Sequence, residues 1–132
     1  MLAVEDLTRA KWNCLHFALP EEAHSTRAEL ASRGLAVFDI DGGTIETKDQ
    51  LLSALAQAMR FPDYFGMNWD ALDECLRSMD WLPSDGYVLF FKNAESFWQK
   101  SSHLAGMFTE IWMAAAEEWG SREIPFHLIF VW

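Results

Sequence analysis

The sequence is poor in basic residues and contains no long apolar run. Its 132 residues include 10 Lys and Arg against 20 Asp and Glu, for a formal net charge of −10 at pH 7. A surface of that sign repels phosphate backbones and anionic lipids, which disfavours direct binding to nucleic acid or to a membrane. No run approaches the ~20 apolar residues of a membrane-spanning helix, and the N-terminal residues lack the pattern of a signal peptide. We therefore expect a soluble, cytoplasmic protein.

Motifs for metals, cofactors and nucleophiles are also missing. The two cysteines, Cys14 and Cys75, specify neither a disulfide framework nor a zinc site, and we expect both to be reduced thiols in the core. The four histidines lack metal-ligand spacing, so we expect surface or hydrogen-bonded core residues. The acidic neighbours of Cys75 would raise the pKa of its thiol, which argues against a nucleophile. The sequence predicts no metal, no cofactor and no catalytic residue.

The chain does have the composition of one globular domain. Hydrophobic residues make up 51% of it, which is enough to build a core without disulfides. At ~100–200 residues per domain, the length predicts a single domain over residues 1–132.

Apolar runs alternate with helical patterns along the chain. Strand-like runs occupy residues 12–19, 35–40, 86–91 and 125–132. Pro20 begins a helix that Gly34 ends, and Thr47 with Gln50 forms a capping box before the next helix. A long helical pattern ends at Gly120. This alternation predicts an α/β fold with a small, mostly parallel sheet flanked by helices.

Negative charge is concentrated in one short segment. Residues 63–85 hold six acidic residues and one basic residue, which is half of the net charge. Asn68 can cap a helix there. The apolar stripe of this helix is Trp69, Leu72, Leu76 and Met79, and its other face carries Asp70, Asp73, Glu74 and Arg77. Like charges at this spacing cost a few tenths of a kcal/mol per pair, partly offset by the pairing of Asp73 with Arg77. Such a face is either simply solvated or suited to binding cationic groups of a partner.

Residues 61–76 carry a recognisable motif. They read Phe-Pro-Asp-Tyr-Phe-Gly-Met-Asn-Trp-Asp-Ala-Leu-Asp-Glu-Cys-Leu. This resembles the hallmark of the barstar-like family, Pro-x-[Tyr/Phe]-[Tyr/Phe]-Gly-x-Asn-x-Asp-Ala-Leu followed by Cys-Leu. The resemblance covers residues 35–132 and implies three strands of the family's sheet. Residues 1–34 are left as an added βα unit, and we expect residues 14–17 to pair as an extra strand beside that sheet.

The resemblance implies a ribonuclease inhibitor and not an enzyme. In this family the acidic helix and the loop before it plug the active site of a barnase-type ribonuclease, with carboxylates where substrate phosphates would lie. The implied partner is a basic bacterial ribonuclease, bound one-to-one by a monomer, in an immunity or antitoxin role. The expected partner-binding residues are Tyr64, Asn68, Asp70, Asp73, Glu74, Arg77 and Trp81. Among the aromatic residues we expect Trp81 to be the exposed one at the interface.

Three departures from the family pattern bear on which partner is bound. Glu74 stands where the family has an Asp, Asp73 replaces an aromatic contact residue, and Ala115 lies near the position of a contacting Glu. The alternative is therefore an interaction or regulatory module that keeps the fold and binds another basic protein.

A second resemblance is weaker. Residues 39–44, Asp-Ile-Asp-Gly-Gly-Thr, are similar to the nucleophile loop of haloacid-dehalogenase-type phosphatases, but an extra glycine displaces the threonine. That chemistry also needs a downstream lysine and an acidic pair to hold Mg²⁺, for which the sequence offers no good candidates. We interpret the segment as a turn that leaves a strand.

Overall fold

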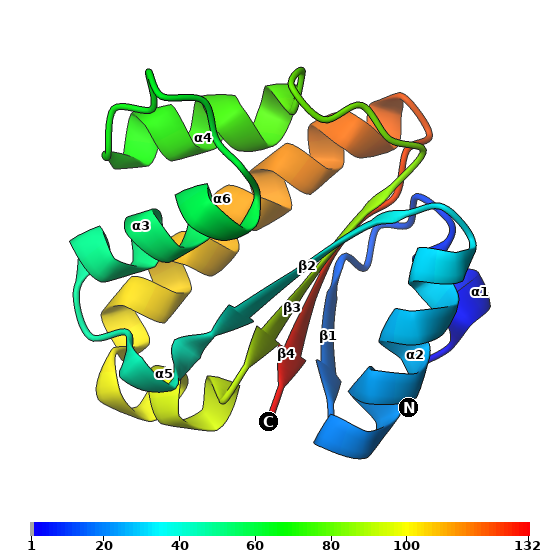
Figure 1. Cartoon of the computed structure of the whole chain (residues 1–132), viewed down its shortest axis with the longest axis horizontal. Coiled ribbons are helices and arrows are strands. Elements are labelled where there is room, and N and C mark those ends of the chain that lie inside the picture. Colours follow the sequence, from blue (N-terminus) through cyan, green and yellow to red (C-terminus); the bar gives the residue numbers. More distant parts are fainter. Residues whose placement is uncertain (1) are drawn as a thin grey trace.

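The computed structural model describes residues 2–132 as an α/β structure (Figure 1). The four strands are β1 (Leu15–Ala18), β2 (Ala36–Asp41), β3 (Tyr87–Lys92) and β4 (Phe126–Val131). The helices are α1 (Val4–Leu7), α2 (Pro20–Ser32), α3 (Lys48–Ala58), α4 (Trp69–Ser78), α5 (Ala94–Lys100) and α6 (Ser102–Ser121), with a 3₁₀ turn, η1, over Gly42–Thr44.

The strands form one parallel sheet in the order β1-β4-β3-β2, which confirms the predicted fold class. β3 is an interior strand, buried from Tyr87 to Phe91, as its continuous apolar run predicts. The first strand is shorter than predicted, because Trp12 is 96% exposed and Asn13 is also exposed, before the pairing with β4 begins. The extra N-terminal strand beside the family's three is confirmed.

The chain crosses the sheet in two directions. It runs from β1 at one edge to β2 at the other, and then returns through β3 to β4. Crossovers between parallel strands are right-handed, so a reversal of direction moves the connecting helices to the opposite face. Figure 1 shows this arrangement, with α1 and α2 on one side of the sheet and α3, α4 and α6 on the other.

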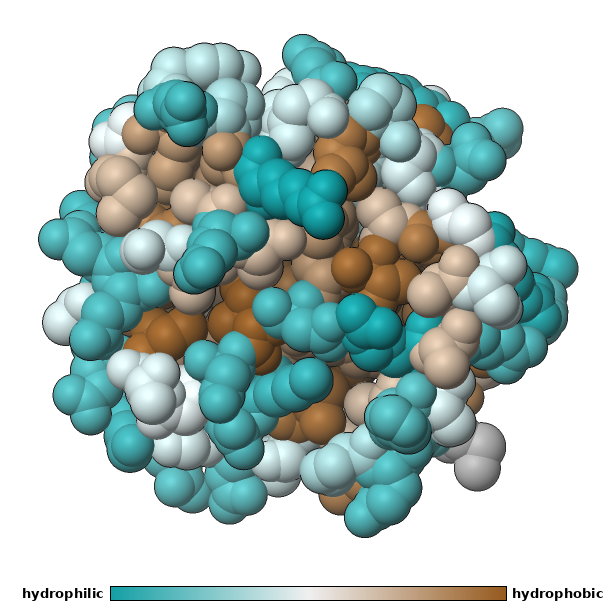
Figure 2. Space-filling view, viewed as in Figure 1, coloured by the Kyte–Doolittle hydropathy of each residue, from teal (hydrophilic) through white to brown (hydrophobic). Residues whose placement is uncertain are grey.

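Alternating side chains of the sheet build two separate apolar clusters. The larger cluster lies against α3 to α6, and its strand residues are Phe38, Ile40, Tyr87, Leu89, Phe91, Phe126, Leu128 and Phe130. The smaller lies under α1 and α2 and contains Leu7, Ala18, Ala23, Leu30, Val88, Phe90, Ile129 and Val131. The N-terminal unit therefore covers a face of the sheet that would otherwise expose apolar side chains. In Figure 2 hydrophobic residues show at the centre of the view, with hydrophilic ones around them.

Hydrogen bonds of two histidines connect the N-terminal unit to β4. His16 Nε2 lies 2.9 Å from His127 Nδ1, and His127 Nε2 lies 2.8 Å from the carbonyl oxygen of Arg9. Because a carbonyl only accepts, His127 donates to Arg9 through Nε2 and accepts from His16 through Nδ1. Burial lowers the pKa of both rings, that of His16 to about 4, so both are neutral at pH 7.

Both cysteines are free and buried, as predicted. Within residues 2–132, no helix combines the length and the apolar character needed to cross a membrane.

Candidate partner-binding surface

The N-terminus of α4 is fixed by the side chain of Asn68. Its Oδ1 accepts from the backbone N–H of Ala71 at 2.8 Å, and its Nδ2 donates to the carbonyl of Gly66 at 3.1 Å. Asn68 is thus the helix cap that the sequence predicts, and it also holds the preceding loop. The predicted stripe is confirmed, because Leu72, Leu76 and Met79 are buried and Trp69 packs against the same cluster.

The loop before α4 presents Tyr64 to solvent. After α3 and its C-cap Met59, Arg60 is in the left-handed conformation (φ 56°), and the N–H of Phe61 donates to the carbonyl of Ala56, as in a Schellman motif. Phe61 is buried, with its ring 4.9 Å from that of Phe65. These two aromatic anchors fix the loop, and Tyr64 between them in sequence is 79% exposed.

An open hollow of about 600 Å³ lies beside the first two turns of α4. Its lining brings together Tyr64, Asn68, Asp70 and Glu74, which are four of the predicted site residues, with Lys48, Gly66, Trp69 and Ala71. Asp70 and Glu74 are exposed and form no ion pair within residues 2–132. Carboxylates held this way on a capped helix can accept hydrogen bonds from Arg, Lys or His of another protein. Lys48, from α3, is a residue that sequence reasoning missed.

Asp73 and Arg77 occupy a different environment on the same helix. Arg77 Nε donates to Asp73 at 2.9 Å, as predicted, and Arg77 Nη1 donates to Glu118 of α6 at 2.6 Å. The hydrogen bond to Glu118, and after it the one to Asp73, raises the pKa of Arg77 above its ordinary value. Arg77 in turn lowers the pKa of Glu118. The acidic face is therefore divided, with Asp70 and Glu74 at the hollow and Asp73 engaged in the contact between α4 and α6.

The structure corrects the expectation for Trp81 and places Ala115. Trp81 is half-buried and not the exposed aromatic, because its indole N–H donates to the carbonyl of Met59 at 3.0 Å and its ring packs edge-on against Phe61. Ala115 is buried in the core, so α6 brings its carboxylate to this surface through Glu118, one helical turn further on. The exposed aromatic residue of the site is Tyr64.

Other candidate chemistries find little support in the geometry. Burial, and secondarily Glu74, raises the pKa of the Cys75 thiol, as predicted. Across residues 2–132, no group of three His, Cys, Asp or Glu side chains is placed to hold a metal ion. Asp39, the nucleophile candidate of the phosphatase-like segment, accepts from Arg27 through Nε, which is shared between both carboxylate oxygens at 2.8 and 2.9 Å, and through Nη2. Asp41 accepts from the backbone N–H of Gly43 in the turn.

Comparison with known families agrees with this geometry. Residues 35–131 match the family described as Barstar (barnase inhibitor). The chain belongs to the barstar family. The match spans β2 to β4 and includes α4, its capping residue and the hollow beside it. Among curated proteins, no sequence matches the chain.

The family match covers one part of the molecule and not the other. The matched region contains every residue that lines the hollow, together with Asp73, Arg77 and Glu118. Strand β1 and helices α1 and α2 lie outside it. The N-terminal unit is therefore an addition to the part of the chain that matches the family.

Proposed function

We propose that this protein inhibits a basic bacterial ribonuclease of the barnase type by covering its active site with α4 and the loop before it. Asp70 and Glu74 accept hydrogen bonds from the cationic groups that otherwise hold substrate phosphates, and Tyr64 and Asn68 contact the enzyme beside them. Inhibition is one-to-one, and the protein itself is not an enzyme. It acts in the cytoplasm, where it protects the cell that makes the ribonuclease.

One observation carries this proposal: in a chain of the barstar family, two exposed carboxylates, which form no ion pair within residues 2–132, lie on a capped helix beside an open hollow. The charge of the whole chain, −10, supports it because it favours the approach of a basic partner.

The test is a titration of barnase activity with the purified full chain. A one-to-one inhibitor abolishes RNA cleavage near equimolar protein. Glu74→Gln should weaken inhibition strongly, whereas Glu21→Gln, an equal charge change on α2, should leave it unchanged. Activity that persists at a large excess of the chain would contradict inhibition of a barnase-type enzyme.

The arrangement around Arg77 favours a second candidate, a module of the same fold that binds another basic protein. Arg77 places a cation beside the acidic hollow, held by Asp73 and Glu118, and a basic partner must fit around it. In that case barnase stays active in the titration, while a different basic protein binds to the chain and loses affinity with Glu74→Gln.

A further inference from the structure

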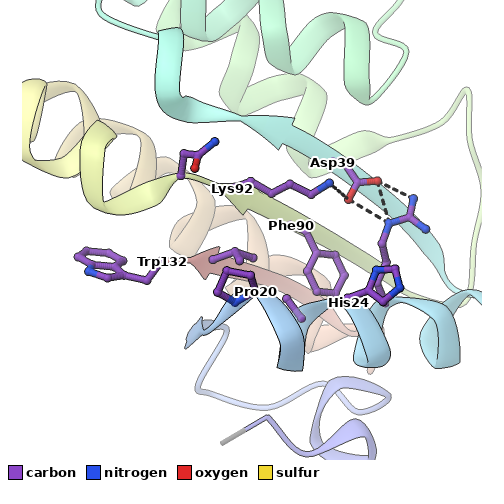
Figure 3. A pocket seen from close by; sticks show the side chains of 10 residues that line it. Pro20, His24, Asp39, Phe90, Lys92 and Trp132 are labelled. Carbon is purple, nitrogen blue, oxygen red and sulfur yellow. Dashed lines mark hydrogen bonds and ion pairs between the residues drawn. The ribbon is translucent and has the colours of Figure 1, made fainter.

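A second cavity lies on the other side of the sheet, under α2 (Figure 3). Its volume is about 300 Å³. Helix α2 lines it with Ala23 and Arg27. The sheet lines it with Asp39, Phe90, Lys92 and Val131. That volume is at the lower end of the range in which small organic ligands bind.

The position of this cavity is one at which α/β proteins bind ligands. In open parallel sheets, ligands bind in crevices at the carboxyl ends of the strands. Lys92 and Val131, which line this cavity, are the last residues of β3 and β4. The wall formed by α2 lies outside the region that matches the barstar family, so this cavity is separate from the proposed inhibitory surface.

The charges in the cavity differ from those of the surrounding protein. Asp39 is already neutralised, because Arg27 donates to both of its carboxylate oxygens. Lys92 forms a longer ion pair with the same carboxylate, at 3.6 Å, and its side chain is 53% exposed. A hydrogen bond from Asn93 and, after it, the charge of Lys92 lower the pKa of Asp41, the neighbour of Lys92 in the register of β2 and β3. Among the side chains of the lining, Arg27 and Lys92 outnumber Asp39, in a chain of net charge −10.

The remaining walls are apolar. Ala23, Phe90 and Val131 belong to the buried cluster under α2, and Trp132, 42% exposed, lies at the rim. Figure 3 shows Lys92 extended toward Asp39 above the ring of Phe90. A ligand here would meet the partly exposed ammonium of Lys92, beside a carboxylate that already accepts from Arg27, and an aromatic and aliphatic floor.

We propose that this cavity binds a small organic anion, a carboxylate or phosphate ester on a compact apolar body. The anionic group pairs with Lys92, and the apolar body lies on Phe90 and Val131. This site is independent of the proposed ribonuclease-binding surface, since the two lie on opposite faces of the sheet.

The experiment titrates the full chain with three probes while backbone amide shifts are recorded by NMR. Benzoate and phenyl phosphate supply the two anion chemistries on one apolar body, and benzamide is the neutral isostere of benzoate. We expect one of the anions to bind with a dissociation constant on the order of 1 mM, as usual for ligands of this size, and to shift the amides of Ala23, Phe90 and Val131. The anion that binds more tightly identifies the ligand class.

Two variants test the assignment. Lys92→Gln should raise the dissociation constant of the anion at least about fivefold, because it removes the positive charge that pairs with it. Lys100→Gln makes the same charge change at an exposed residue that does not line the cavity, and it should leave binding unchanged. The proposal is overturned if neither anion shifts these amides, if benzamide binds as well as benzoate, or if the two lysine variants behave alike.

Discussion

The two faces of the sheet differ in how their carboxylates are paired. On the face with α3 to α6, Asp70 and Glu74 stand exposed beside a hollow and form no ion pair within residues 2–132. On the face with α1 and α2, the carboxylate of Asp39 is paired inside the molecule, with Arg27 and with Lys92. The family-matched face thus presents the exposed carboxylates that the proposed binding of a basic partner requires, whereas the added N-terminal unit covers apolar side chains of the sheet.

Removing residues 1–34 should have the largest effect on stability. The deletion exposes Val88, Phe90, Ile129 and Val131, and each large apolar side chain that leaves the core costs about 1.5–3 kcal/mol. We expect a lower denaturant midpoint and lower solubility than for the full chain, measured by urea unfolding and by sedimentation. Equal midpoints and equal solubility would show that the unit does not contribute to the stability of the sheet.

Acidification should weaken the attachment of the N-terminal unit through His16. Its pKa is about 4 in the folded chain against an ordinary value of 6.5, so between these values the unfolded chain binds more protons. Stability then falls as the pH drops from 6.5 toward 4, by on the order of 2 kcal/mol for this residue. Urea unfolding across this range should show a shallower pH dependence for His16→Gln than for the unmodified chain. The exposed His103 provides the control, and a slope that changes equally in His103→Gln would contradict the assignment.

Added salt should slow the association of a basic ribonuclease with the family-matched face. If the acidic residues between 63 and 85 steer a basic ribonuclease, association slows as the Debye length shrinks from ~30 Å at 0.01 M to ~8 Å at 0.15 M salt. We expect about a tenfold fall in the association rate constant and a smaller change in dissociation, measured by stopped flow. An association rate that is constant across this range would remove the steering argument.

Asp73 should show the smallest effect. Asp73→Ala removes a partly exposed ion pair with Arg77, which is worth less than about 1 kcal/mol of stability, and Arg77 keeps its contact with Glu118. Its effect on partner binding should also be smaller than that of Asp70→Ala or Glu74→Ala. Thermal unfolding and binding measurements on the same samples separate the two effects, and a loss of affinity equal to that of Glu74→Ala would show that the division of the acidic face is wrong.

Local signals were enough to predict most of the fold. The capping box of Thr47 and Gln50 begins α3, and the left-handed Gly34 follows α2, as their residue types indicate. Short elements without such signals were missed. Helix α5 has seven residues and begins after Asn93, whose backbone is left-handed and whose side chain makes no cap, so nothing local marks it.

The candidate site was predictable only where its residues are close in sequence. Asp70 and Glu74 lie one helical turn apart, so helical spacing alone places them together, and Asn68 is recognisable as the cap of their helix. Lys48 and Glu118 come from α3 and α6, and only tertiary packing brings them to α4. The burial of Trp81 has the same origin, since its hydrogen bond to Met59 spans 22 residues.

The central claim is that Asp70 and Glu74 form the inhibitory contact, and calorimetric titration of a barnase-type ribonuclease with four variants tests it most directly. Asp70→Ala and Glu74→Ala should each weaken binding by about 2–5 kcal/mol, the usual cost of leaving an interfacial charge unpaired, with little change in unfolding midpoint. Asp73→Ala should cost less. Glu74→Asp should tighten binding to barnase, since it restores the side-chain length that the family motif has at this position, and should weaken binding to the natural partner. If Asp70→Ala and Glu74→Ala both stay within a factor of about two of the unmodified chain, well below the 1.4 kcal/mol of a tenfold change, α4 is not the inhibitory surface.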